Sequence, residues 1–371
     1  MSVRQETSAG WVPRPTLPGR TYWHPDVWTD EQERIFSAEW ICVGREEEVP
    51  APGSYMVREV GSESVVVIRA KDGALHAHFD TCSHRGTRLL DGEGDLRSAV
   101  IRCPYHAWTF AADGELLATP NVVAGEGFDR SARPLWRIAL ETWNGFVFVN
   151  MASEPGPLRE ALARTMDGDP TPLVARWGIG DLRIGHRITY EVEANWKLVV
   201  ENYSECLHCP GIHPELVKLV PLFRTGRVED DRGAELAGGA VGFTRTGTTT
   251  RPPLPGLTEH DRHIYMGNVL FPTTMINLHA DCVMSYRLEP VGPTHTRIVS
   301  EFLFHPDTIE RTDFDPGDVV ELWDLVSRQD WAVCERAQLG VRSRAYAAGG
   351  VYPENDHSVA AFNDRYRAAM A

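Results

Sequence analysis

Several common features are missing from this sequence. No run of apolar residues is long enough to cross a bilayer, and residues 1–20 lack both the apolar core of a signal peptide and an arginine-rich amphipathic pattern. Basic residues do not cluster, and 37 Lys and Arg face 52 Asp and Glu, for a net charge of -15. Such a chain repels phosphate backbones. We therefore expect a soluble, cytoplasmic protein that binds neither membrane nor nucleic acid.

Cysteine is also scarce. Seven cysteines, an odd number, are spread through 371 residues, so we expect no disulfide framework. No G-x-G-x-x-G segment follows a strand, which predicts that the chain itself holds no flavin or nicotinamide. The length allows about two domains. What needs an explanation is the placement of the seven cysteines and fourteen histidines.

The pattern of the chain changes near residue 150. Between about Met56 and Asn150, short β-rich runs alternate with Gly, Asp and Asn turns, which is typical of a small antiparallel β domain. After the Pro/Gly stretch 153–157, strands mix with helices expected at about Trp196–Cys209 and Asp318–Gly340. The long stretch 225–262, rich in Gly, Thr, Arg and Pro, predicts either a mobile flap or an ordered excursion near a site.

The first candidate metal site combines two mixed pairs. Cys82 and His84 form a C-x-H pair, and after eighteen intervening residues Cys103 and His106 form a C-x2-H pair, both beside turn residues. Two metal groups suit two cysteines and two histidines: tetrahedral zinc, or a [2Fe–2S] cluster in which one iron takes both histidines. Zinc fingers usually place both cysteines in one arm, whereas each arm here supplies one Cys and one His. The division favours the cluster over zinc, and over four residues that merely pack.

The second candidate site begins at Asn195. Glu205 and His208 share a face if the segment is helical, and Pro210-Gly211 allows the chain to turn and aim His208 and His213 at one point. Two histidines and one carboxylate form the facial triad of non-haem Fe(II) oxygenases, with open positions for dioxygen and substrate. The residues alone leave three acids open as the carboxylate: Asp324, Asp330 and Glu335. Cys206 and Cys209 form a C-x-x-C pair that could also indicate zinc or redox chemistry, but we expect them to pack on one helix face, and Cys42, Cys282 and Cys334 to be packing residues as well.

Both segments resemble the α subunits of Rieske non-haem iron oxygenases, also called ring-hydroxylating oxygenases. The matching runs are Cys82–Gly86, Cys103–Trp108, Asn195–Pro214 and Gln329–Glu335. The resemblance implies an α+β fold with three parts: an N-terminal segment, residues 1–40, packing on the catalytic domain; a small antiparallel β Rieske domain, 41–152; and a helix-grip catalytic domain, 153–371, with an antiparallel sheet around a long C-terminal helix.

The resemblance also assigns roles. Cys82, His84, Cys103 and His106 would bind the [2Fe–2S] cluster, and His208, His213 and Asp330 the mononuclear iron. Glu205 would bridge the iron ligand to the partner subunit's His106 within a homotrimer, and Asn202 would support the site without binding metal.

The implied reaction is activation of dioxygen and oxidation of a small molecule. Electrons would come from NAD(P)H through a separate flavin/iron–sulfur reductase. The run E-C-x-H-C-P, from Glu205 to Pro210, resembles the branch that hydroxylates or demethylates quaternary ammonium compounds such as carnitine, choline and betaines. An aromatic cage would hold the cation, with Tyr203, Phe271 and Tyr286 as candidates. The alternatives are an aromatic-acid hydroxylase, dioxygenase or O-demethylase on the same scaffold, an electron-transfer protein without chemistry, and a zinc-stabilised binding module without catalysis.

Overall fold

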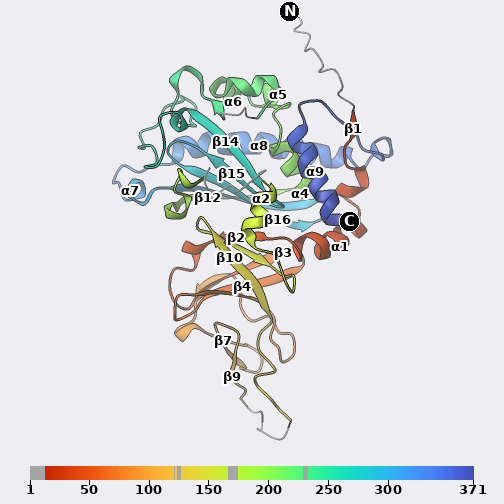
Figure 1. Cartoon of the computed structure of the whole chain (residues 1–371), viewed down its shortest axis with the longest axis vertical. Helices are drawn as coiled ribbons and strands as arrows, with labels where there is room; N and C mark the ends of the chain where they lie inside the picture. The colour runs from red at the N-terminus through yellow and green to blue at the C-terminus, as the bar shows by residue number, and fades with distance from the viewer. Residues whose placement is uncertain (1–12, 121, 123–126, 166–173, 229–232) are drawn as a thin grey trace, which may run out of the picture. The chain divides into compact units, whose positions relative to one another are not determined.

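The computed structural model describes residues 13–120, 122, 127–165, 174–228 and 233–371. The chain forms two compact units (Figure 1). Ile35–Arg164 make one unit, and Thr165–Ala371 make the other together with the N-terminal residues up to Arg34. Every paired strand in the described residues is antiparallel. The expected α+β class with antiparallel sheets is confirmed.

The unit 35–164 is built from two sheets. The larger has the strand order β2-β11-β10-β5-β4-β3-β6 and the smaller β7-β8-β9. The strands of the larger sheet are β2 (Ile41–Arg45), β3 (Ser54–Val60), β4 (Glu63–Arg69), β5 (Leu75–Phe79), β6 (Glu93–Asp95), β10 (Arg137–Trp143) and β11 (Phe146–Asn150). Those of the smaller are β7 (Val100–Arg102), β8 (Thr109–Ala111) and β9 (Leu116–Ala118), and helix α2 (Leu158–Thr165) follows both sheets.

Turn chemistry fixes the hairpins of this unit. The carboxylate of Asp72 accepts the N–H of Ala74 at 3.0 Å, and Gly73 between them has φ +90°. Asp113 and Gly114 repeat the arrangement between β8 and β9, where Gly114 has φ +92°. An aspartate that closes its own turn and a glycine that tolerates positive φ are what such tight connections require. The apolar core that these strands enclose includes Cys82 and Cys103 (below).

The larger unit is organised around a six-stranded sheet and one long helix (Figure 1). The sheet order is β12-β17-β16-β15-β14-β13. Its strands are β12 (Arg183–Val192), β13 (Ala234–Glu235), β14 (Ile264–Leu270), β15 (Thr274–Leu278), β16 (Val283–Gly292) and β17 (His295–Phe304). Helix α8 (Gly317–Gly340) packs against it: Tyr190 of β12 donates to Asp324 at 2.8 Å, and the hydroxyls of Tyr286 and Ser327 lie 2.6 Å apart. The long C-terminal helix expected at Asp318–Gly340 is confirmed.

The helix expected at about Trp196–Cys209 is shorter than the pattern indicated. Helix α4 spans Trp196–Tyr203, and two short helices follow, α5 (Cys209–Ile212) and α6 (Pro214–Leu219). Ser204 donates its hydroxyl to the carbonyl of Val200 at 2.7 Å. Glu205 accepts the backbone N–H groups of the two residues before α5. Polar side chains that bind the local backbone in this way compete with helical hydrogen bonds, so the chain turns after Tyr203.

The described segments nearest the two termini contact each other and α4. Strand β1 (Arg14–Pro15) pairs with β18 (Val351–Tyr352), and helices α1 (Pro25–Glu31) and α9 (His357–Met370) lie beside them; α7 (Pro306–Ile309) precedes α8. Glu31 and Lys197 form a fully buried ion pair, with Nζ 2.5 Å from Oε1. Tyr22 and Asn363 donate to Glu201 at 2.7 and 2.8 Å. These contacts fix the helix that leads into the second candidate site.

The described part of the stretch 225–262 is an ordered excursion rather than a flap. Arg251 is buried and pairs with Asp281 at 3.0 Å and with Asp318 at 2.5 Å. The ring of Phe243 stacks on His279, with centroids 4.4 Å apart. Residues 229–232 lie outside the described residues.

Candidate metal centres

The first set of donors lies on two loops with the same backbone form. In Cys82–Thr87 and in Cys103–Trp108, the N–H of the first residue donates to the carbonyl of the sixth, at 2.9 and 2.8 Å. The N–H of the fifth residue donates back to the carbonyl of the first, at 2.9 and 3.1 Å. That fifth residue has positive φ in both loops, +72° at Gly86 and +57° at Ala107. The repetition places Cys82 and Cys103 at the same position of their loops, while His84 is the third residue of its loop and His106 the fourth.

The four donors separate into a buried end and an outer rim. Cys82 and Cys103 are 1% and 2% exposed, whereas His84 is exposed and His106 half-buried. The imidazole centroids lie 4.7 Å apart. A [2Fe–2S] cluster with two cysteines on one iron and two histidines on the other needs this division, so these residues fit that group.

The electrostatics of these loops suit metal ligation. Burial raises the pKa of the Cys82 thiol, while the N–H groups of His84 and Arg85 donate to its sulfur and favour the thiolate. Desolvation and the neighbouring His106 lower the pKa of His84, which keeps its imidazole in the neutral form that binds metals. Trp108 stacks on His84 with centroids 4.5 Å apart and planes 8° from parallel, which limits rotation of the ring.

The second set of donors converges on one carboxylate oxygen. Asp330 Oδ1 of α8 lies 3.2 Å from His208 Nε2 and 2.8 Å from His213 Nε2. His208 immediately precedes α5 and His213 immediately follows it, so this four-residue helix spaces the two imidazoles, whose centroids are 5.1 Å apart. Two imidazoles and a carboxylate gathered in this way are the donor set of a facial triad.

The other two acids on α8 are engaged elsewhere. Asp324 accepts the hydroxyl of Tyr190, and Glu335 accepts the backbone N–H of Glu193 at 3.2 Å. Of the three carboxylates that the sequence left open, the structure thus brings Asp330 to both histidines.

The charged forms of Asp330 and His208 stabilise each other. Burial opposes ionisation of Asp330, yet hydrogen bonds from His208 and His213 hold its pKa below the ordinary value. Burial likewise opposes charging of His208, but Asp330 and Glu205 raise its pKa to about 9. The carboxylates of Asp330 and Glu205 therefore stabilise positive charge at His208, and a divalent cation would supply such charge as well. The donor set fits a mononuclear iron.

Each imidazole is oriented by an oxygen behind it. Glu205 Oε1 lies 2.5 Å from His208 Nδ1, and Gln329 Oε1 lies 2.7 Å from His213 Nδ1. An acceptor at Nδ1 fixes the tautomer and leaves the Nε2 lone pair directed toward the metal. Asn202 Nδ2 is 3.5 Å from His208 Nδ1, at the limit of a hydrogen bond. The role of Gln329 was not foreseen: it adjoins Asp330 in sequence, but adjacent residues on a helix point in different directions, so spacing gave no signal.

The three aromatic candidates for substrate contact fall into two places. Tyr203 and Tyr286 lie together, with ring centroids 6.4 Å apart, and Tyr286 bonds to Ser327, which is one turn of α8 from Asp330. Phe271 packs instead against Phe362 of the C-terminal helix, with centroids 5.9 Å apart. The structure therefore groups two of the three near the second centre.

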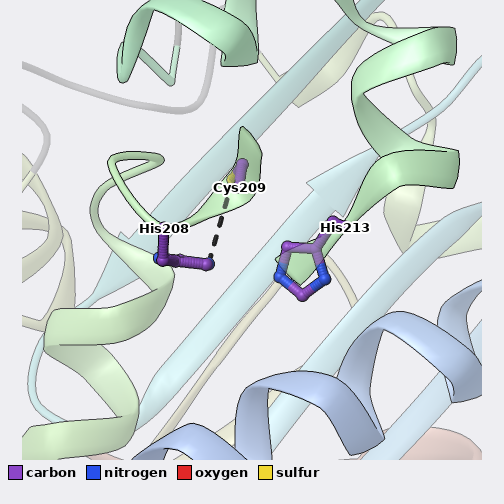
Figure 2. A group of neighbouring side chains, drawn as sticks. All are labelled: His208, Cys209 and His213. Atoms are coloured by element: carbon purple, nitrogen blue, oxygen red, sulfur yellow. Dashed lines mark hydrogen bonds between the residues drawn. The ribbon is translucent and has the colours of Figure 1, made fainter. Parts of the chain in front are cut away.

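Cys206 and Cys209 form a disulfide, which corrects the expectation that they merely pack on a helix face. Because α4 ends at Tyr203, the two residues lie on a turn rather than on one regular helix, and their Cα atoms are 4.9 Å apart, within disulfide range. The ring that this bond closes contains Leu207 and His208. Figure 2 shows the Cys209 side chain directed toward the His208 ring, with His213 nearby. Cys42, Cys282 and Cys334 are buried cysteines outside this disulfide, as expected of packing residues.

Comparison with known families agrees with both centres. Residues 39–138 match the Rieske [2Fe-2S] domain, and residues 179–371 match the catalytic domain of the ring-hydroxylating α subunits. The chain is an iron-dependent oxygenase of the Rieske type. It belongs to the family of ring-hydroxylating oxygenase α subunits, whose cofactors are the expected [2Fe–2S] cluster and mononuclear iron.

Individual proteins of this family are similar to the chain over most of its length. The chain is 29% identical to the glycine betaine monooxygenase oxygenase subunit of Chromohalobacter salexigens, over 96% of this chain and 86% of that protein. It is 32% identical to the carnitine monooxygenase oxygenase subunit of Acinetobacter baumannii, over 90% and 87%. The crystal structure of the quaternary ammonium Rieske monooxygenase CntA superposes with a TM-score of 0.78 at 29% identity, covering 97% of this chain and 96% of that one. Naphthalene 1,2-dioxygenase, at 19% identity and a TM-score of 0.76, shares the fold.

A membrane-spanning helix is absent from the described part of the chain, since none of its helices is both long and apolar enough to cross a bilayer.

Proposed function

We propose that the chain is the oxygenase component of a monooxygenase that acts on a small quaternary ammonium compound, with electrons from NAD(P)H supplied by a separate flavin/iron–sulfur reductase. The observation that carries the proposal is the convergence of His208, His213 and Asp330 in a chain that also holds the Rieske loops. The substrate class is supported by the glycine betaine and carnitine monooxygenases among its relatives, and by the run from Glu205 to Pro210, which resembles that branch of the family.

Cys82, His84, Cys103 and His106 would hold a cluster that supplies single-electron transfer. The facial triad would hold an iron that supplies activation of dioxygen for insertion into a C–H bond. The protein's own contribution is orientation. His208, His213 and Asp330 would hold the iron as a set of two histidines and one carboxylate, a donor set that keeps open positions for dioxygen and substrate. Glu205 and Gln329 hold the two imidazoles in the tautomer that binds metal, with acceptor oxygens 2.5 and 2.7 Å from Nδ1.

We place the substrate beside Tyr203 and Tyr286, whose rings supply the negative faces that a trimethylammonium group prefers. We propose that Asn277 makes a second contact, with the carboxylate of the substrate. The hydroxyls of Tyr203 and Tyr265 both donate to its Oδ1, at 2.9 and 2.5 Å. Among the described residues its Nδ2 is buried without a hydrogen-bond partner. An amide N–H held in that way would pair with the carboxylate of a betaine, because an unpaired buried donor is costly.

We further propose a homotrimer in which Glu205 links His208 to the partner subunit's His106. The support is the short contact from Glu205 to His208, together with the exposure of Leu207 beside it and of Tyr105 on the cluster loop, 41% and 59%. Co-expression of two inactive chains, one with Cys82→Ala and one with His208→Ala, tests this. Activity recovered in the mixed oligomer, but absent when the two purified homo-oligomers are combined without exchange, is the expected result. No recovery would refute transfer between subunits.

A substrate screen tests the function itself. With a surrogate reductase and NADH, oxygen consumption and product formation should be measured on glycine betaine, carnitine and choline, with benzoates and aryl methyl ethers as the opposing class. Turnover confined to the quaternary ammonium compounds, coupled to oxygen use, is expected. Coupled turnover of the aromatic class would support a hydroxylase or O-demethylase instead. A protein that contains only zinc would refute any oxygenase.

A further inference from the structure

The Cys206–Cys209 disulfide lies beside two of the proposed metal ligands, His208 and His213. Cys209 Sγ is 3.8 Å from His208 Nε2, the nitrogen that would bind the metal. The donor atoms of His208, Cys209 and His213 all lie within 4.8 Å of one another (Figure 2). Both cysteines are buried, at 4% and 2% exposure. The sulfur of Cys209 thus lies beside the two histidines of the triad.

A sulfur atom in this place has two very different chemical states. In the disulfide it is a poor ligand, because metals bind the thiolate. As a thiolate it would be the strongest donor for soft and borderline metals in the centre. Two histidines, one aspartate and one cysteine make a four-ligand set of the kind that closes a tetrahedral zinc site, whereas a catalytic centre keeps a position open. The covalent state of Cys209 therefore decides whether the centre offers three ligands or four.

We propose that Cys209 is a latent fourth metal ligand, which its disulfide with Cys206 masks. A dithiol reductant breaks the S–S bond by giving it two electrons and two protons, and is itself oxidised to a disulfide. Cys209 then gives up its thiol proton to water as it binds the metal. Reduction converts an open, iron-holding triad into a closed site that selects zinc and has no position for dioxygen. The inference rests on the proposed function in one respect, that His208, His213 and Asp330 hold the metal.

Two matched variants separate ligation from a purely structural role. Cys206→Ser and Cys209→Ser both abolish the disulfide and change one buried sulfur to oxygen. Only Cys206→Ser leaves the Cys209 thiol free beside His208. If the disulfide merely holds the loop in place, the two variants should behave alike. If Cys209 is a ligand, they should differ in metal content whatever their stability.

The experiment uses the full chain with its cluster intact, which visible absorbance monitors. Oxidised wild type, dithiol-reduced wild type and both serine variants are exposed anaerobically to equal Fe2+ and Zn2+, desalted and analysed for metals. We expect the ratio of zinc to iron at this centre to be at least about tenfold higher in the reduced wild type and in Cys206→Ser than in the oxidised wild type and in Cys209→Ser, because the thiolate adds a ligand that favours zinc. X-ray absorption at the zinc edge, which does not detect the cluster iron, should show sulfur at about 2.3 Å in the two zinc-loaded samples.

Three results would overturn the inference. One is equal zinc uptake by the two serine variants, and another is a zinc site without sulfur. The third is more than five reactive thiols in the denatured, unreduced and cluster-free protein, since the seven cysteines less the disulfide leave five. A His208→Ala chain identifies failure of the proposed function separately. If it retains as much mononuclear iron as the oxidised wild type, the triad itself is wrong; if it loses that iron while the serine variants match, only the role of Cys209 fails.

Discussion

Gln329→Leu should weaken binding of the mononuclear iron although Gln329 is not itself a proposed ligand. Its Oε1 lies 2.7 Å from Nδ1 of His213, whose side chain is 1% exposed, so water cannot replace the lost acceptor. A buried N–H left unpaired costs about 1–3 kcal/mol. Loss of a hydrogen bond behind a metal-binding histidine typically weakens the metal by about 10–100-fold, which is about 1.4–2.8 kcal/mol. The two independent estimates agree.

The assay is anaerobic equilibrium competition for Fe2+ between the full chain and a chelator, with cluster iron counted separately from its absorbance. Gln329→Glu is the matched variant, because it keeps an oxygen in the same place, and it should bind iron within about threefold of wild type or more tightly. Asn202→Ala is the contrasting one. Its amide lies 3.5 Å from His208 Nδ1, an atom that Glu205 already holds at 2.5 Å. We expect less than about a threefold change there.

If the Gln329→Leu chain bound Fe2+ within threefold of the wild-type affinity, then α8 and α5 would orient His213 without this hydrogen bond. If Asn202→Ala were as damaging as Gln329→Leu, contact distance would not be what ranks the two residues. Either result would refute the reasoning that an acceptor at Nδ1 sets the affinity of the site.

Three further predictions follow from buried charge. Lys197→Met should lower the unfolding free energy by about 3–5 kcal/mol because it leaves the Glu31 carboxylate buried without its cation, whereas the double change with Glu31→Gln should lower it far less; denaturant unfolding followed by tryptophan fluorescence measures both. Burial raises the pKa of Glu201 from 4.5 to about 7. The contribution of Glu201 to the unfolding free energy is therefore fully present below pH 4.5 and is lost as the pH rises toward 7. Glu201→Gln should flatten that fall by about 3 kcal/mol in unfolding measured at several pH values. Asp330→Ala should lose the mononuclear iron yet keep the EPR signal of the reduced cluster, and loss of both signals would point to misfolding instead.

The sequence predicted the architecture where local patterns agree with the fold. The apolar spacing of α8 and the Asp-Gly turns at residues 72–73 and 113–114 have one low-energy structure each, and both were foreseen. The paired Cys and His of the Rieske loops could also be predicted from the sequence, because few residue types can bind such a cluster. These features depend on a few neighbouring residues, and such features can be read without tertiary information.

Features that depend on distant contacts could not be predicted in the same way. The choice of Asp330 over Asp324 and Glu335 is a matter of which turn of α8 faces the loop at His208, and only the packing of α8 on the sheet decides that. Gln329 has no motif of its own. The separation of Phe271 from the two tyrosines follows from its contact with the C-terminal helix, which lies far away in sequence.

The end of α4 shows why local propensity failed at the site in particular. A continuous helix would place His208 and His213 about 140° apart around its axis, and no single metal could reach both. The chain instead gives up the helix after Tyr203: Glu205 caps the following turn through its backbone contacts and at the same time holds His208 Nδ1. The same carboxylate therefore breaks the helix and orients the histidine. Glu205→Ala should disturb the loop geometry and the metal site together, whereas Glu205→Gln, which keeps an acceptor oxygen, should retain the loop and separate its structural role from its charge.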